Sequence, residues 1–119
     1  MIKGLDHIAI IVSSEKSLRF YMKLGFTELY RTEREHDTVV LMLLSGTEII
    51  LEVFIDPNHP ERMSDPEAKG LRHFALKVDY IEGTLEELGI EGSNIMKDWI
   101  GTRYCFISDP DGLPIELHE

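Results

Sequence analysis

The sequence predicts an α+β protein made of two βαβββ modules, each with a curved mixed sheet and a helix on its outer face. The stretch Gly4–Val12 recurs in register as Gly70–Val78, and the two copies place histidines 66 positions apart. Each half also closes on a strand that carries a glutamate between aliphatic residues. These glutamates, Glu52 and Glu116, are 64 positions apart. Two nearly equal offsets indicate an internal duplication.

The first module is expected to cover about residues 1–54. Alternating side chains predict a strand over 5–12. Ser13 or Ser14 can cap a helix that runs to about Leu24, where Gly25 ends it. Three further strands are expected over 26–34, 38–44 and 48–54, the last two joined by a turn at Ser45-Gly46-Thr47. The segment 55–70 contains three prolines and many charges, which is typical of a linker between modules and of a lid beside a ligand site.

The second module, about 71–119, repeats the same order. Its helix over 80–88 has an apolar face and ends at Gly89, although Gly83 is unfavourable inside it. The run Asp109-Pro110-Asp111-Gly112 is typical of a turn. Its four strands are expected over 71–78, 94–98, 103–108 and 114–118. Residues 1–119 should together form a single domain.

Composition excludes several classes of partner. Hydrophobic residues make up 43% of the chain, which is typical of a globular protein, and the net charge is −10. Such an acidic surface disfavours nucleic acid and anionic membranes. The sequence contains neither an apolar run long enough to span a bilayer nor a signal-peptide pattern. The single cysteine, Cys105, lies in an expected strand, so a buried thiol and a reducing, cytoplasmic setting are expected.

The repeated histidines and glutamates predict a metal site. Alternation along the strands places His7 and His73 on the faces turned away from the helices. Glu52 and Glu116 likewise lie opposite aliphatic neighbours. A carboxylate among aliphatic side chains is costly to bury unless it is paired or binds a cation. Two imidazoles and two carboxylates would neutralise one divalent ion, such as Ni, Co, Zn, Mn or Fe.

The alternative interpretation is a polar cluster without metal. A single histidine on a strand is usually a hydrogen-bonded core residue, and a glutamate near the C-terminus is usually solvated. The return of both residues in both halves favours the metal site. His36, His59 and His118 have no counterpart in the other half and are expected to be solvated. No dinucleotide-binding, Walker A or GxSxG motif occurs, and no nucleophile motif accompanies Cys105.

The chain resembles the vicinal oxygen chelate superfamily, which includes glyoxalase I, bleomycin-resistance proteins, extradiol dioxygenases and methylmalonyl-CoA epimerase. The motifs that carry the resemblance are Gly4-Leu5-Asp6-His7, Phe20-Tyr21 with Leu24-Gly25-Phe26, Gly70-Leu71-Arg72-His73, and Asp109-Pro110-Asp111-Gly112 before Glu116. The resemblance implies paired modules that form a cup around a metal ion, often within a homodimer. It implies His7, Glu52, His73 and Glu116 as the ligands, a set similar to that of bacterial glyoxalase I. Ile11 stands where glyoxalase I usually has an arginine that helps hold glutathione, so a glutathione-derived substrate is not expected.

The expected function is that of a metal-dependent, glyoxalase-like lyase or isomerase acting on a small substrate with vicinal oxygens. The ion would act as a Lewis acid, and Glu52 or Glu116 would move a proton as general base and then acid. Two alternatives remain. One is an epimerase of acyl thioesters, and the other is a resistance-type protein that binds a small molecule without turning it over.

Overall fold

The computed structural model describes all of residues 1–119 and divides them into two compact units, Met1–Pro60 and Glu61–Glu119. The division falls inside the segment 55–70 that was expected to link the modules. Each unit has the element order β-α-β-β-β, and each contains one four-stranded sheet. The predicted fold class is therefore confirmed. The grouping of both modules into a single domain stays a prediction.

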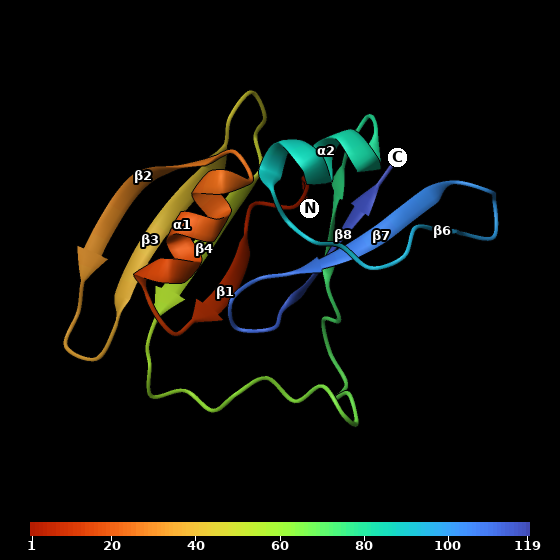
Figure 1. The fold of residues 1–119 in the computed structure, drawn as a ribbon. Helices are drawn as coiled ribbons and strands as arrows, with labels where there is room; N and C mark the ends of the chain where they lie inside the picture. The colour runs from red at the N-terminus through yellow and green to blue at the C-terminus, as the bar shows by residue number, and fades with distance from the viewer. The chain divides into compact units, whose positions relative to one another are not determined.

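The first unit consists of one mixed sheet and one helix. Its elements are β1 (Ile8–Val12), α1 (Glu15–Lys23), β2 (Phe26–Glu33), β3 (Thr38–Leu44) and β4 (Ile50–Ile55). The strands lie in the order β1-β4-β3-β2. β1 and β4 are parallel, while the other neighbours are antiparallel. Figure 1 shows α1 lying across one face of this sheet.

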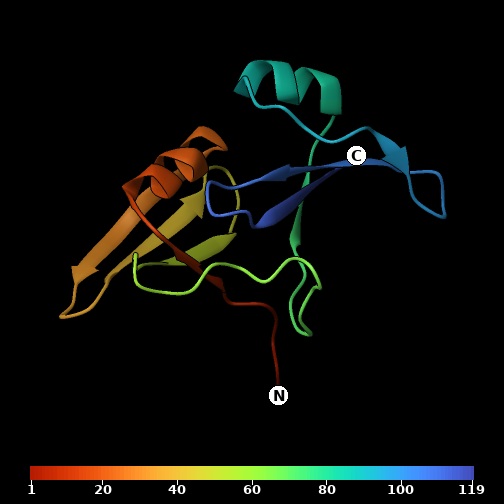
Figure 2. The same cartoon turned by 60° about the horizontal axis from the view of Figure 1, so that its bottom comes forward.

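The second unit repeats this topology. Its elements are β5 (Phe74–Lys77), α2 (Ile81–Leu88), β6 (Met96–Lys97), β7 (Arg103–Ser108) and β8 (Pro114–His118). The strands lie in the order β5-β8-β7-β6, and only β5 and β8 are parallel. Figure 2 shows α2 to one side of β7 and β8. No helix of the chain is both long and apolar enough to cross a bilayer.

The core of the first unit lies between α1 and the sheet. Ser14 caps α1, because its hydroxyl accepts a hydrogen bond from the Lys16 amide. Tyr21 of α1 is fully buried and meets the Phe26 ring edge to face, with centroids 6.0 Å apart. Burial of side chains of this size contributes roughly 1.5–3 kcal/mol each. Because α1 packs on one face of the sheet, the other face of β1 and β4 points away from the helix.

The second unit confirms the predicted helix end and explains the glycine inside the helix. Gly89 ends α2 in the left-handed conformation, with a φ of 63°. A Cβ at Gly83 would lie 2.9 Å from Cδ1 of Tyr80, so the tyrosine ring uses the space that glycine leaves. The side chain of Glu119 accepts a hydrogen bond from the Ile81 amide and caps the other end. The thiol of Cys105 is buried, as expected.

The turn predicted at Asp109 is confirmed. Its carboxylate Oδ1 accepts hydrogen bonds from the amides of Asp111 and Leu113, both at 2.9 Å. Gly112 has a φ of 84°, a conformation that glycine adopts without strain. The turn leads directly into β8, which pairs with β5 and contains Glu116.

The first strand of each module is shorter than predicted. β1 begins at Ile8 and β5 at Phe74, so residues 5–7 and 71–73 precede the strands. A strand needs a partner, and β4 begins at Ile50, which the register places opposite His7, so residues 5 and 6 have no partner in β4. In the second unit the partner strand begins at Pro114, which has no amide hydrogen to donate. His7 and His73 therefore stand at the entrance of their strands and not within them.

The strand predicted over 94–98 is reduced to β6 (Met96–Lys97). The hydroxyl of Ser93 accepts a hydrogen bond from the Phe106 amide, and the Ser93 amide donates to the Phe106 carbonyl. The Phe106 amide thus donates to the side chain of Ser93 in place of a backbone carbonyl. This interrupts the regular pairing with β7, so β6 does not extend back to residue 94.

Candidate metal centre

His7 lies at the entrance of β1 with its ring held between two carboxylates. Its Nδ1 lies 2.8 Å from Oδ1 of Asp6, and its Nε2 lies 3.7 Å from Oε1 of Glu52. A carboxylate at Nδ1 favours the tautomer that carries its proton there. The lone pair of Nε2 then faces Glu52. A carboxylate behind a histidine in this manner orients a ring whose other nitrogen binds metal.

The two carboxylates also raise the pKa of His7 above its ordinary value. The hydrogen bond to Asp6 is the main cause, burial opposes it, and the charge of Glu52 adds to it. A ligating imidazole must be neutral, so protons and a cation compete for His7. Metal binding at this residue should therefore weaken as the pH falls.

Glu52 is placed by the alternation of β4. Its neighbours Leu51 and Val53 are fully buried, so Glu52 points to the opposite face, away from α1. Its side chain is 28% exposed, and its backbone stands beside Ala9 of β1. The small alanine leaves room beside the carboxylate. The predicted face of Glu52 is confirmed.

The second unit places its own pair in the same register. His73 comes one residue before Phe74, which pairs with Ile115, and Glu116 then pairs with Ala75. In the first unit, His7 comes one residue before Ile8, Ile8 pairs with Leu51, and Glu52 pairs with Ala9. Ile115 and Leu117 are buried on either side of Glu116, so its side chain also points away from the core. The duplication seen in the sequence is thus a duplication of backbone register.

His73 carries an unsatisfied polar atom. Its Nδ1 is buried and has no hydrogen-bond partner, and its ring meets Phe106 edge to face with centroids 4.9 Å apart. A buried ring nitrogen without a partner costs roughly 1–3 kcal/mol. In the tautomer with the proton on Nε2, the lone pair of Nδ1 could bind a cation, and that would remove this cost.

The donor chemistry of both pairs fits a divalent ion. Two ligands bound to one ion at about 2.0–2.2 Å lie roughly 3.0–3.5 Å apart. The 3.7 Å between His7 Nε2 and Glu52 Oε1 is too long for a hydrogen bond and close to that separation. The structure thus brings His7 and Glu52 together. Neither unit by itself gathers three His, Cys, Asp or Glu side chains that could hold a metal ion, so a four-ligand centre stays a prediction.

Some polar contacts were not predicted from the sequence. Asp6 could have been found from its place next to His7, although the duplication gives no signal because Arg72 stands at the equivalent position. His118 was expected to be solvated, and its side chain is 32% exposed. It is partly buried, with Nε2 3.2 Å from Oδ2 of Asp98. These two residues are 20 positions apart, and no sequence pattern pairs them.

Matched βαβββ units, each with a histidine and a glutamate in equivalent register, define the class of protein that the sequence resembles. Residues 4–117 match the model of the Glyoxalase/Bleomycin resistance protein/Dioxygenase superfamily. The chain belongs to this superfamily.

Close relatives cover the whole chain. It is 43% identical to uncharacterized protein YwkD of Bacillus subtilis (strain 168), over 100% of this chain and 98% of that protein. It is 41% identical to uncharacterized protein YaeR of Escherichia coli (strain K12), over 99% of this chain and 97% of that protein. The crystal structure of a glyoxalase family protein from Enterococcus faecalis superimposes with a TM-score of 0.89 at 40% identity, covering 98% of each chain.

Proposed function

We propose that the protein is a divalent-metal-dependent lyase or isomerase of glyoxalase type that acts on a small substrate with vicinal oxygens. His7, Glu52, His73 and Glu116 would hold one ion, such as Ni, Co, Zn, Mn or Fe. The observation that carries the proposal is the identical register of the two His–Glu pairs. Two supporting features are the Asp6 carboxylate behind His7 and the unsatisfied Nδ1 of His73.

When bound, the ion supplies a Lewis acid for the oxygens of the substrate. The residues of the chain supply positioning and proton transfer. Asp6 fixes the tautomer and direction of His7. Glu52 or Glu116 accepts a proton from a substrate carbon next to a carbonyl and returns it to the neighbouring position. A single carboxylate thus serves first as base and then as acid, and the overall isomerisation consumes no co-reactant.

The experiment that tests the proposal is elemental analysis of the protein purified without a histidine tag. We expect close to one divalent ion per chain, and loss of that ion in both His7→Ala and His73→Ala. His36→Ala is the matched control, because the side chain of His36 is 85% exposed and belongs to neither pair. Protein that contains no metal and takes none up on incubation would refute the proposal.

A non-catalytic binding protein is the second candidate. What favours it is that the superfamily is named for bleomycin resistance proteins as well as for enzymes. In that case the His–Glu pairs would serve as hydrogen-bonding groups for a captured molecule. Ligand affinity that is unchanged by chelators, together with no turnover of any bound compound, would favour this function over the enzyme.

A further inference from the structure

An apolar hollow lies on the same face of the first unit as Glu52. It has a volume of about 270 Å³ and is lined by Ala9 and Ile11 of β1, Phe54 of β4, and His59. Ala9 stands beside Glu52 in the sheet, and Ile11 stands beside Phe54. Because side chains alternate, Glu52 and Phe54 point to the same side of β4. The hollow therefore continues directly from the carboxylate along the sheet.

The hollow is within reach of a molecule held at His7 and Glu52. Two residues along a strand span about 6.5–7 Å. A substituent attached two to four bonds from an oxygen at Glu52 would therefore enter the space over Ala9 and Ile11. Ile11 is 52% exposed although it is a large aliphatic side chain, so it has apolar surface to offer such a group.

The charged residues around the hollow are already paired. The guanidinium of Arg34 lies over the Phe54 ring, 5.5 Å from its centroid. Its Nε and Nη2 donate to the two carboxylate oxygens of Asp37 at 2.6 and 2.5 Å. His59 is similarly paired, with Nε2 3.4 Å from Oδ2 of Asp56. The Arg34 guanidinium therefore packs against the aromatic ring, and two of its three nitrogens already donate to Asp37.

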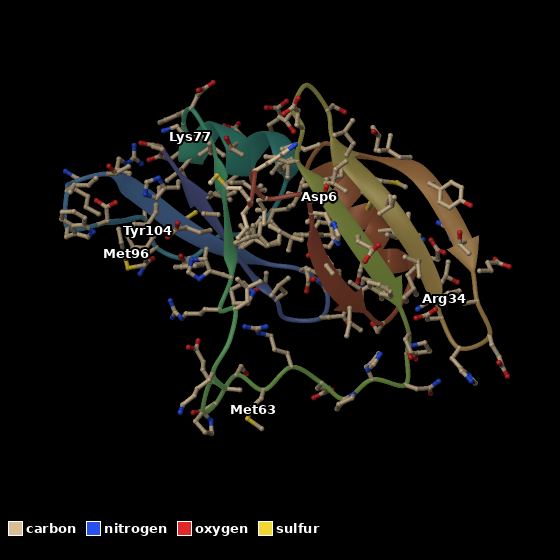
Figure 3. The ribbon with its side chains drawn as sticks, turned by 180° about the vertical axis from the view of Figure 1, so that it is seen from behind. Asp6, Arg34, Met63, Lys77, Met96 and Tyr104 are labelled. Carbon is tan, nitrogen blue, oxygen red and sulfur yellow. The ribbon has the colours of Figure 1, made fainter.

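The balance of charge on this face argues against an anionic substituent. Glu52 is left out of this balance, because the proposed metal ion would offset its charge. The remaining ion pairs along the path from His7 to His59 on this face contain three carboxylates and one guanidinium; the carboxylates are those of Asp6, Asp37 and Asp56. Figure 3 shows Asp6 near the start of β4 and Arg34 near its end, so the arginine stands at the far end of this path. A carboxylate that a substrate carried past the metal ion into the hollow would meet the net negative charge of these groups, because the one guanidinium is already paired with Asp37.

We infer that this hollow is a specificity pocket that receives an uncharged, apolar part of the substrate, of about the size of a phenyl ring or a branched alkyl group. The inference rests on the proposed function, which places the oxygens of the substrate at His7 and Glu52. An enclosed apolar cavity of about 150 Å³ holds benzene. The hollow is partly open to solvent, and its volume of about 270 Å³ leaves space for a phenyl ring together with its linking atoms.

The first test compares three hydroxamates on zinc-loaded protein by calorimetry. Benzohydroxamate should bind on the order of tenfold more tightly than acetohydroxamate. Succinic monohydroxamate, which extends a carboxylate into the same space, should gain nothing over acetohydroxamate. Phe54→Ala should remove the preference for the phenyl group, and Ile11→Arg should improve binding of the succinyl compound. Leu29→Ala, at an exposed leucine on β2, is the matched control and should leave all three affinities unchanged.

The second test needs no metal. Benzyl alcohol is titrated into metal-free protein while the methyl signals of Ala9, Ile11 and Leu29 are followed by NMR. Shifts at Ala9 and Ile11, but not at Leu29, would support the pocket whether or not the protein binds zinc. A failure to bind zinc would refute the proposed function but not the pocket. Zinc binding with equal affinities for the three hydroxamates and no shift at Ala9 or Ile11 would overturn the pocket and leave the proposed function intact.

Discussion

The carboxylate of Asp6 lies 2.8 Å from Nδ1 of His7, and this contact turns Nε2 of the same ring toward Glu52. Asp6 is 96% exposed as a side chain, so solvent competes for it, yet it is the main cause of the raised pKa of His7. The contact fixes both the direction and the tautomer of the ring. It is therefore the part of the proposed centre that can be perturbed without removing a ligand.

Asp6→Ala should weaken metal binding by about 10- to 100-fold, because the loss of a residue that orients a ligand has effects of this size. The measurement is a competition titration of zinc against a coloured chelator at pH 7. Glu35→Gln removes another exposed carboxylate next to a histidine and serves as the control. An unchanged zinc affinity in Asp6→Ala would show that the Asp6–His7 contact has no role in metal binding.

Much of the fold could be predicted from the sequence, because alternation, caps and glycines act locally. The ranges of β3, β7 and β8 agree with the predicted 38–44, 103–108 and 114–118. The errors occur where a partner decides the outcome. Residues 5 and 6 have no partner because β4 begins at Ile50, opposite His7. The side chain of Ser93 interrupts the pairing that would extend β6.

The candidate site could be predicted in part for a similar reason. The four proposed ligands could be predicted from the duplication, because a repeat keeps equivalent residues at equivalent positions along the chain. The contacts between Arg34 and Phe54 and between His118 and Asp98 could not be predicted in this way, because they depend on how far side chains reach across neighbouring elements. A duplication reveals what two halves share, whereas the apolar hollow belongs to the first unit alone.

Glu52→Gln and Glu116→Gln should separate binding from proton transfer. Glutamine keeps the size of the side chain but cannot accept a proton as a base. The carboxylate that moves the proton should lose at least about 100-fold in rate on substitution. The measurement is uptake of solvent deuterium into a panel of hemithioacetals and 2-methyl acyl thioesters, with circular dichroism to verify the fold.

The same panel distinguishes the lyase or isomerase from the epimerase. Turnover of hemithioacetals indicates the first, whereas deuterium uptake into a thioester without net conversion indicates the second. Glu33→Gln, at an exposed carboxylate on β2, is the control. Full activity in both the Glu52 and Glu116 variants would exclude a role for these carboxylates in proton transfer.

Glu15 should stabilise the first unit only while it is ionised. Arg31 donates to both carboxylate oxygens, at 2.5 and 3.2 Å, and this hydrogen bonding holds the pKa of Glu15 below its ordinary value of 4.5. A lowered pKa in the folded protein means that the stabilisation is present above the unfolded pKa and is lost as the pH falls through the folded pKa.

Glu15→Gln should therefore lower the free energy of unfolding at pH 7 by less than about 1 kcal/mol, since the pair is partly exposed. The difference from the unsubstituted protein should disappear at pH values well below 4.5. Thermal unfolding across this range measures it, with the exposed Glu91→Gln as control. A difference that persists at low pH would assign the effect of Glu15 to packing and not to its charge.

Gly83 and Tyr80 should be energetically coupled. Alanine at position 83 would favour the helix by up to about 1 kcal/mol, but its Cβ would lie 2.9 Å from Cδ1 of Tyr80. Tyr80 is 56% exposed, so its ring can move at the cost of its contacts. We expect Gly83→Ala to leave stability nearly unchanged in the natural background and to stabilise the Tyr80→Ala variant by about 0.5–1 kcal/mol. Urea unfolding of the four proteins of this cycle measures the coupling. Equal effects of Gly83→Ala in both backgrounds would show that the tyrosine ring is not the reason for glycine at this position.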